Sequence, residues 1–484
     1  MSKWKHGENP YDESIGAVFD LGNNQRLHGR IVLDQEALSY ASTTSVFEDK
    51  LVSIPQGSDL HGTSERGRVS LLSCYGGGGL VPAEVQQPTV VDGGSTSVSI
   101  RSEYAVFGNE YLKRNDPVIR GIRFAFHDFH AMLGLASVGY HAFGSIVDPD
   151  PRILEAIDRH KPTHAPAVSE HDSPWLFYFT GEHDILPPAQ TVLGAITVLR
   201  DLHVTMSSGT NASDIPYVNI DFDDDPVTID GAVAKMNTVR QFFAWIVGYA
   251  PTWNDVQVFK GKKIPQEYHR VNDNGNPDPG FDVFTSYFGG TTSQRTTPSG
   301  GHTLISPLGQ SDHFMDVMTN WLARNRDRAR ANRTFFASTR GMFTTVLEDR
   351  ICASANVFDQ LPVSDRRNKR AKMLDVARRR YQKVIRPHVK LTDMEKVIES
   401  AVNCRHYITH GSTKGKTHGV DYSDWGAVEF LTEALRFVYG AYELLDCGWD
   451  MQHWLQRLFK RDHPFGRFTQ LYEDRLSSVM PQDG

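Results

Sequence analysis

Apolar and polar residues alternate in short runs over the first half of the chain, and this pattern is typical of half-buried β-strands. Turn-forming residues separate the runs, which suits antiparallel pairing. The runs lie at residues 16–21, 26–34, 68–75, 96–108, 118–129, 175–181, 194–206 and 215–222. We therefore expect a β-rich N-terminal part, folded as a sandwich or as one curved sheet.

Apolar residues recur every three or four positions beyond residue 307, which indicates amphipathic helices. The segment 313–361 shows this most clearly, with arginines opposite its apolar side. Further helices are expected at residues 366–385, 392–411 and 423–447, and together they predict an all-α bundle. One earlier segment, residues 230–250, has the same spacing and is expected to lie as a helix on the sheet.

The two parts are separated by a segment rich in Gly, Ser, Thr, Asn and Pro, a composition that buries little apolar surface. At 484 residues the chain also exceeds what one hydrophobic core usually serves. The expected organisation is a β-rich sensing or regulatory domain at 1–270, a linker at 271–306 and a helical domain at 307–484. The predicted fold class is thus α+β and multidomain, with a sandwich-like β-rich domain followed by an all-α helical bundle.

Composition is that of a soluble globular protein, with 39% hydrophobic and 23% charged residues. No run of about 18 apolar residues occurs, and the first residues lack the apolar segment of a signal peptide, so we expect a cytoplasmic protein without a membrane partner. Four cysteines are scattered without zinc-type spacing, and no metal or cofactor is expected.

Charge is distributed unevenly along the chain. Residues 307–484 carry 28 Lys and Arg against 22 Asp and Glu, whereas residues 1–306 carry 23 against 36. The basic excess suggests a nucleic-acid or phosphate partner for the helical part, and the Arg-rich runs 324–333 and 364–380 are candidates for contact with an RNA backbone. Helices with solvated arginine faces explain the same charge equally well.

The segment 403–416, NCRHYITHGSTKGK, carries the candidate chemistry. The helix that contains it is expected to begin with a capping box of Thr392 and Glu395 and to end at Gly411. In a straight helix Arg405 and His410 point roughly 140° apart, whereas His406 and His410 share a face. An end that unwinds at Gly411 would allow the histidine to reach the arginine.

Arginine and histidine together can cleave RNA without a metal ion. Histidine exchanges protons near neutral pH, and the planar, always charged guanidinium can bind phosphate oxygens as charge develops. The alternative is a basic helix end, where both side chains interact favourably with the helix dipole.

The position of the pair, closing a helix in a basic helical domain that follows a β-rich one, resembles the HEPN superfamily of nucleases. The wider chain resembles the ApeA family of bacterial anti-phage proteins, which join an N-terminal β-rich domain to a C-terminal HEPN domain. Besides the Arg/His motif, this likeness rests on GAVFDLGNNQRLHGRIVLD with DLHGTSERGRVSLLSCY, on NTVRQFFAWIVGYAPTWNDVQVF, and on FMDVMTNWLA.

The resemblance implies that Arg405 contacts the scissile phosphate and that His410 acts as general acid or base. His406 stands where such nucleases most often have Asn, and it either orients His410 or shares in proton transfer. An acidic residue of an earlier helix is implied nearby, and the candidates are Glu348, Asp349 and Asp359. We expect Tyr407, Lys414 and Lys416 to contact RNA.

The function expected is that of a metal-independent endoribonuclease of anti-phage, abortive-infection defence, giving 2′,3′-cyclic phosphate and 5′-hydroxyl ends. Its substrate would be RNA, with tRNA as one candidate. A phage-derived trigger and a homo-oligomer, dimeric or larger, are implied by the resemblance. The alternative is a non-catalytic HEPN module that binds RNA or a protein.

Overall fold

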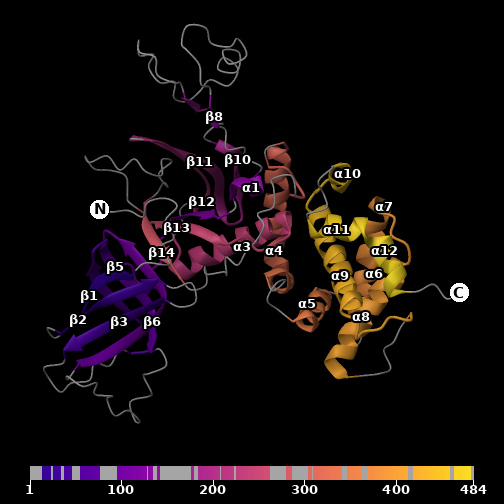
Figure 1. Ribbon diagram of the computed structural model, residues 1–484, viewed down its shortest axis with the longest axis horizontal. Coiled ribbons are helices and arrows are strands. Elements are labelled where there is room, and N and C mark those ends of the chain that lie inside the picture. Colours follow the sequence, from indigo (N-terminus) through magenta and orange to yellow (C-terminus); the bar gives the residue numbers. More distant parts are fainter. Residues whose placement is uncertain are drawn as a thin grey trace, which may run out of the picture.

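The structure is a computed structural model with a β-rich N-terminal part and a helical C-terminal part (Figure 1). This arrangement confirms the α+β fold class expected from the sequence. The residues described are 14–22, 25–33, 38–45, 55–76, 95–127, 129–133, 139–141, 176–178, 184–207, 209–222, 225–261, 280–285, 303–307, 309–340, 346–361, 369–411, 418–457 and 463–480.

The first six strands close into an antiparallel barrel. They follow one another in the order β6-β3-β2-β1-β4-β5, and β5 pairs back to β6, so that the ring has no free edge. Alternate residues point inward, as Ile15, Ala17 and Phe19 of β1 do. The strands are β1 (Ser14–Gly22), β2 (Gln25–Leu33), β3 (Leu38–Ser45), β4 (Ser58–Ser64), β5 (Gly67–Gly76) and β6 (Ser95–Gly108).

Strand β6 also belongs to an open sheet with the order β10-β11-β12-β7-β13-β14-β6. The first half of β6 pairs with β3 and the second half with β14, which lies within the segment 271–306. The other strands of this sheet are β7 (Gly121–Phe126), β10 (Asp184–Thr191), β11 (Gly194–Ser207), β12 (Gly209–Asp221), β13 (Trp253–Phe259) and β14 (Phe281–Phe284). A short helix α1 (Phe129–Leu133) and a two-stranded sheet of β8 (Gly139–His141) and β9 (Leu176–Tyr178) complete this part.

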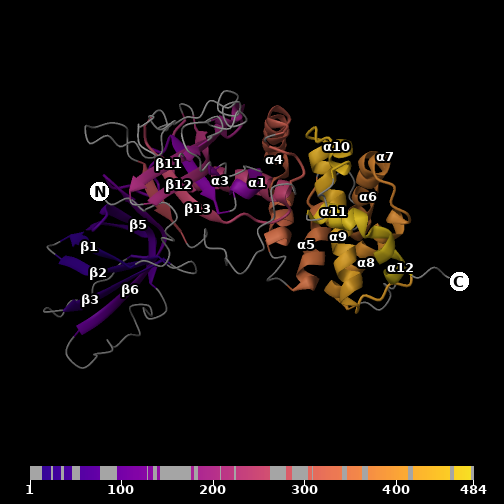
Figure 2. The same cartoon turned by 45° about the horizontal axis from the view of Figure 1, so that its top comes forward.

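Helix α3 (Ile229–Val247) lies on one face of the open sheet, as the apolar spacing predicts (Figure 2). The Phe243 ring packs on Phe126 of β7 and Phe129 of α1, with centroids 5.5 and 5.3 Å away. The Thr228 side chain caps its first turn, and Gly248 ends it in the left-handed conformation.

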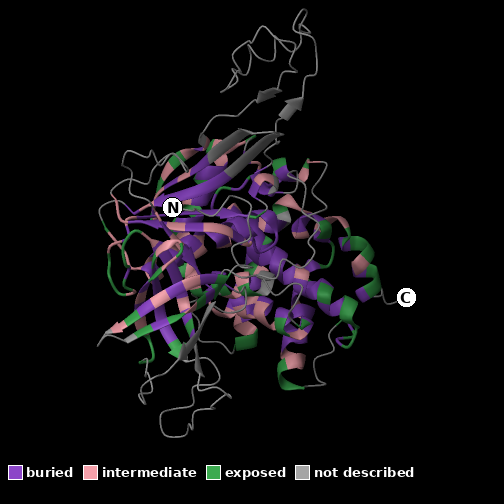
Figure 3. Cartoon of the chain, turned by 60° about the vertical axis from the view of Figure 1, so that its left-hand side comes forward, coloured by how far each residue is buried: buried purple, intermediate pink, exposed green. Residues whose placement is uncertain are grey.

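The helical part packs against α3 through α4 (Ser311–Arg340), which stands between α3 and the other helices in both views (Figures 1 and 2). Phe242 meets Phe314, and Trp245 meets Trp321, at centroid distances of 5.5 and 5.1 Å. One apolar core therefore runs from the open sheet through α3 into the helices, whereas the barrel has a core of its own (Figure 3).

Most of the remaining helices pack around α9, which is buried along nearly all of its length. Gly440 lets α9 approach α3 closely, because a methyl group there would lie 2.8 Å from the Trp245 indole nitrogen and 2.5 Å from the Phe465 ring. The helices of this part that follow α4 are α5 (Leu347–Asp359), α6 (Lys369–Arg380), the π-helix η3 (Tyr381–Ile385), α7 (Arg386–His388), α8 (Met394–His410), α9 (Trp425–Leu445), α10 (Met451–Leu455), α11 (Pro464–Gln470) and α12 (Tyr472–Val479).

The capping box expected at the start of α8 is wrong. Asp393 occupies the cap position with no side-chain hydrogen bond. Thr392 instead donates its hydroxyl to Glu473 of α12 over 2.7 Å, and Glu395 accepts from Gln382 over 2.6 Å. Hydrogen bonds to residues outside α8 thus replace the two that were expected within its first turn.

None of the helices in the described ranges combines the length and the apolar character needed to cross a membrane.

Candidate functional site

Helix α8 carries the Arg405, His406 and His410 side chains and packs against α5, α6 and α9. The helix stays regular up to His410, and Gly411 then adopts a left-handed conformation with φ 61° and donates its N–H to the Tyr407 carbonyl. The expected stop at Gly411 is confirmed. Because unwinding begins only after His410, the two predicted catalytic side chains leave the helix on different sides.

Arg405 points toward α5 and is 8% exposed. Its Nη2 donates a hydrogen bond to the side-chain oxygen of Asn356 over 3.2 Å. Its Nε is buried and has no hydrogen-bond partner among the described residues. One turn further, Thr409 lies 3.7 Å from the Cys352 sulfur, so α5 and α8 run antiparallel along this contact.

His406 and His410 form a pair of imidazoles one turn apart, as their spacing predicts. Their ring centroids are 4.7 Å apart, at an interplanar angle of 57°. His406 is half-buried and His410 is exposed. Partial burial, followed by the charges of His410, Arg370 and Arg405, lowers the pKa of His406 below 6.5, so that the neutral imidazole is favoured at neutral pH.

Arg370, at the start of α6, joins this cluster. Its Nε donates to the side-chain oxygen of Asn403 over 2.6 Å, and Asn403 is buried two residues before Arg405. No hydrogen bond joins Arg405 to His410 in the part of the chain that the structure describes. The structure therefore brings two imidazoles and two guanidinium groups near one another at this end of α8, with Asn356 bound to Arg405 and Asn403 bound to Arg370.

The acidic candidates occupy different places on α5. Glu348 lies near Cys404, whose pKa is raised to about 12 by burial and, less strongly, by the charges of Cys352 and Glu348. Asp349 is exposed. Asp359 lies at the other end of α5 and pairs with Lys369 and Lys372 of α6.

The residue that holds Arg405 was not among the sequence candidates. Asn356 stands four residues after Cys352 and eight after Glu348, so all three share one face of α5. This spacing was the available signal, but only the packing of α5 on α8 shows which face turns toward Arg405.

The predicted RNA-contact residues fall in two groups. Tyr407 is half-buried and packs on Tyr422, with ring centroids 5.6 Å apart. Lys414 and Lys416 lie outside the described residues.

Several arginines of the two Arg-rich runs form ion pairs inside the helical part, while others of the first run are exposed. Arg324 and Arg328 of α4 and Arg380 of α6 converge on Glu443 of α9, which is 1% exposed. Asp446 also pairs with Arg324. Burial acts to raise the pKa of Glu443, but the three arginines outweigh it and hold the pKa below its usual range. These three arginines therefore tie α4, α6 and α9 together.

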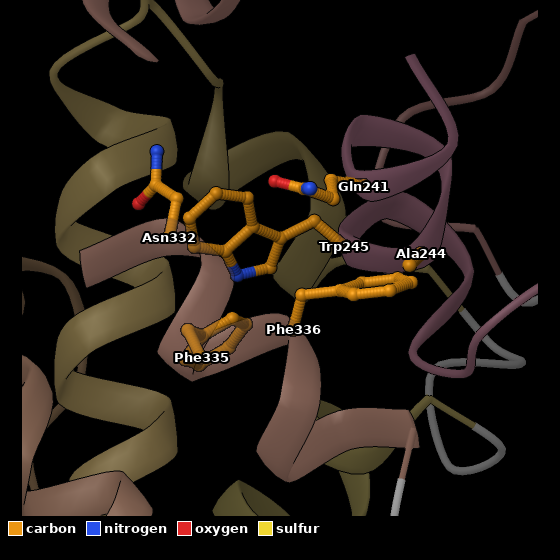
Figure 4. A pocket seen from close by; sticks show the side chains of 6 residues that line it. All are labelled: Gln241, Ala244, Trp245, Asn332, Phe335 and Phe336. Carbon is orange, nitrogen blue, oxygen red and sulfur yellow. The ribbon is translucent and has the colours of Figure 1, made fainter. Parts of the chain in front are cut away.

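A small pocket lies at the junction of α3 and α4, away from α8 (Figure 4). It is lined mainly by the rings of Trp245, Phe335 and Phe336 and has no charged side chain. No cluster of three His, Cys, Asp or Glu side chains suited to a metal occurs among the described residues.

Part of the chain matches a known protein family. Residues 13–168, about a third of the chain, match the family described as ApeA N-terminal domain 1. No curated protein and no solved structure matches the chain. The β-barrel and the first strands of the open sheet thus fall within an ApeA-like N-terminal domain, which supports an ApeA-like protein.

Proposed function

We propose that the helical part is a HEPN-type, metal-independent endoribonuclease whose active site is the cationic end of α8. The observation that carries this proposal is the pair of adjacent imidazoles, His406 and His410, beside two arginines that have no carboxylate partner among the described residues. Two histidines can divide proton transfer between a base and an acid, and the arginines supply positive charge for a phosphodiester.

In the proposed reaction, His406 accepts the proton of the ribose 2′-hydroxyl, since its lowered pKa keeps the imidazole neutral. The 2′-oxygen attacks phosphorus, and the bond from phosphorus to the 5′-oxygen breaks. His410 donates a proton to the departing 5′-oxygen. Arg405 stabilises the charge that develops on the phosphate oxygens, and the products carry 2′,3′-cyclic phosphate and 5′-hydroxyl ends.

The match to an ApeA N-terminal domain supports a role in anti-phage defence, in which cleavage of cellular RNA, such as tRNA, stops phage growth in the cytoplasm. The β-rich part would sense a phage-derived trigger. Because Arg405 and His410 leave α8 on different sides, a homo-oligomer in which a second copy completes the cleft fits the proposal.

The test is RNA cleavage in EDTA by the full chain, with identification of the product ends. His406→Ala, His410→Ala and Arg405→Ala should each lose more than about 100-fold in rate, the range of general acid–base catalysis. His453→Ala, which removes an exposed histidine of α10, is the matched control and should cleave normally. Equal activity in all variants would refute the proposed site.

A second candidate is a non-catalytic module that binds RNA or a protein. The observation in its favour is the burial of Arg405 and its bond to Asn356, which suit a structural arginine. This candidate predicts that Arg405→Ala destabilises the fold and that no variant, nor the wild type, releases cyclic-phosphate ends.

A further inference from the structure

We propose that Arg370 is a second phosphate-binding residue of the site, which contacts the backbone phosphate next to the scissile one. The inference rests on the proposed ribonuclease function and narrows its substrate class. A substrate with at least two phosphates can engage both arginines, so an oligonucleotide would be cleaved better than a dinucleotide.

The first argument is the charge balance of α6. Each of its other basic residues forms an ion pair with a carboxylate, whereas Arg370 has none among the described residues. Arg370 is nevertheless exposed, at the first turn of the helix. The paired residues are Lys369 and Lys372 with Asp359, Arg378 with Glu399, Arg379 with Asp375, and Arg380 with Glu443.

The second argument is that Arg370 is held in place. Asn403 is 3% exposed, and its oxygen accepts the Arg370 Nε hydrogen over 2.6 Å. With Nε engaged, the two terminal nitrogens form the remaining edge of the guanidinium, which can bind two phosphate oxygens side by side. A neutral amide orients the side chain without cancelling its charge.

The third argument is position. Asn403, which binds Arg370, lies two residues before Arg405 on α8. The Arg370 charge is also close enough to His406 to lower the pKa of that imidazole. Arg370 therefore stands beside the reacting groups on a different helix from Arg405. A phosphate bound by Arg405 leaves Arg370 to the neighbouring phosphate of the same strand.

The experiment measures RNA binding and cleavage separately. Binding of a short single-stranded RNA is measured against salt in the His410→Ala protein, with and without Arg370→Ala. Loss of one phosphate contact should weaken binding about tenfold at low salt and reduce the slope of log K against log salt by about 0.7. Arg379→Ala removes the same charge from an exposed, paired position of α6 and should leave the slope unchanged.

Cleavage supplies the second readout. Arg370→Ala should lower kcat/KM for an oligonucleotide about tenfold more than for a dinucleotide with one phosphate, mainly through KM. Arg370→Lys should restore part of the loss. The inference would be overturned if the Arg370 and Arg379 variants had equal salt slopes, or if Arg370→Ala lost the same factor in kcat/KM on both substrates. It would also be overturned if the protein bound no RNA at all. A wild type that binds RNA but does not cleave it would instead overturn the proposed function, while the slopes still decide the role of Arg370.

Discussion

The Arg405 guanidinium of α8 is bound to the Asn356 side chain of α5 across 3.2 Å. This neutral partner orients the arginine and leaves its positive charge available. Asn356→Asp tests the arrangement with almost no change in volume. We expect a charge-assisted bond that raises Tm but neutralises Arg405, so that RNA cleavage falls at least tenfold. A variant that is more stable and fully active would show that Arg405 does not act on the substrate.

The lowered pKa of His406 predicts the pH dependence of the proposed RNA cleavage. A base must be deprotonated to act, so its activity is lost as the pH falls through its pKa. The acid limb of kcat/KM should therefore lie below 6.5. Arg370→Ala removes one of the charges that lower this pKa and should move the limb upward, whereas Arg379→Ala should not. An acid limb unmoved by Arg370→Ala would argue against His406 as the base.

Glu443 predicts a large effect on stability. Glu443→Gln keeps the shape of the side chain but leaves Arg324, Arg328 and Arg380 with much less compensating charge in a buried place. We expect a loss of about 3–5 kcal/mol in the free energy of unfolding, measured by urea denaturation. Glu429→Gln, at a half-exposed partner of Arg475, should change it by less than about 1 kcal/mol.

The same residue gives a pH-dependent stability. Since the folded-state pKa of Glu443 lies below its ordinary value of 4.5, its contribution is fully present above that value and is lost as the pH falls through the folded-state pKa. The difference in stability between wild type and Glu443→Gln should therefore shrink below about pH 4.5. A constant difference across that range would contradict the assignment.

Gly440 predicts a packing effect where α9 meets α3. Gly440→Ala places a methyl group against the Trp245 and Phe465 rings, and the cost of overpacking should exceed the gain in helix propensity, for a net loss of about 1–2 kcal/mol. Gly426→Ala, in the first turn of the same helix, meets nothing closer than 3.4 Å and should be neutral or stabilising. Thermal unfolding of the two variants makes the comparison.

The strands and helices that the sequence predicts are those with strong periodicity. Strands β3, β4, β10, β13 and β14 were not among the predicted runs. In β10, Pro187 and Pro188 interrupt the alternation, and its place at the edge of the open sheet explains why prolines are tolerated there. Closure of the barrel depends on the pairing of β5 with β6, which no local pattern encodes.

In the candidate site, too, contacts within one helix could be predicted from the sequence, whereas contacts between helices could not. The His406 and His410 pair follows from helical spacing alone. Asn356 and Arg370 come from two other helices and required the packing of α5 and α6 on α8. The sequence did not predict the ion pairs of Arg324, Arg328 and Arg380 either, because their shared partner Glu443 is distant from all three in sequence.

The continuous core also decides how motion in the β-rich part can reach α8. Aromatic rings follow one another from Phe126 through Phe243 and its helix to Trp245, then to Tyr439 and to Phe358 of α5, two residues from Asn356. Close-packed rings do not deform gradually. A movement of the sheet would therefore be passed to α5 as a sliding of α3 across α4 and α9.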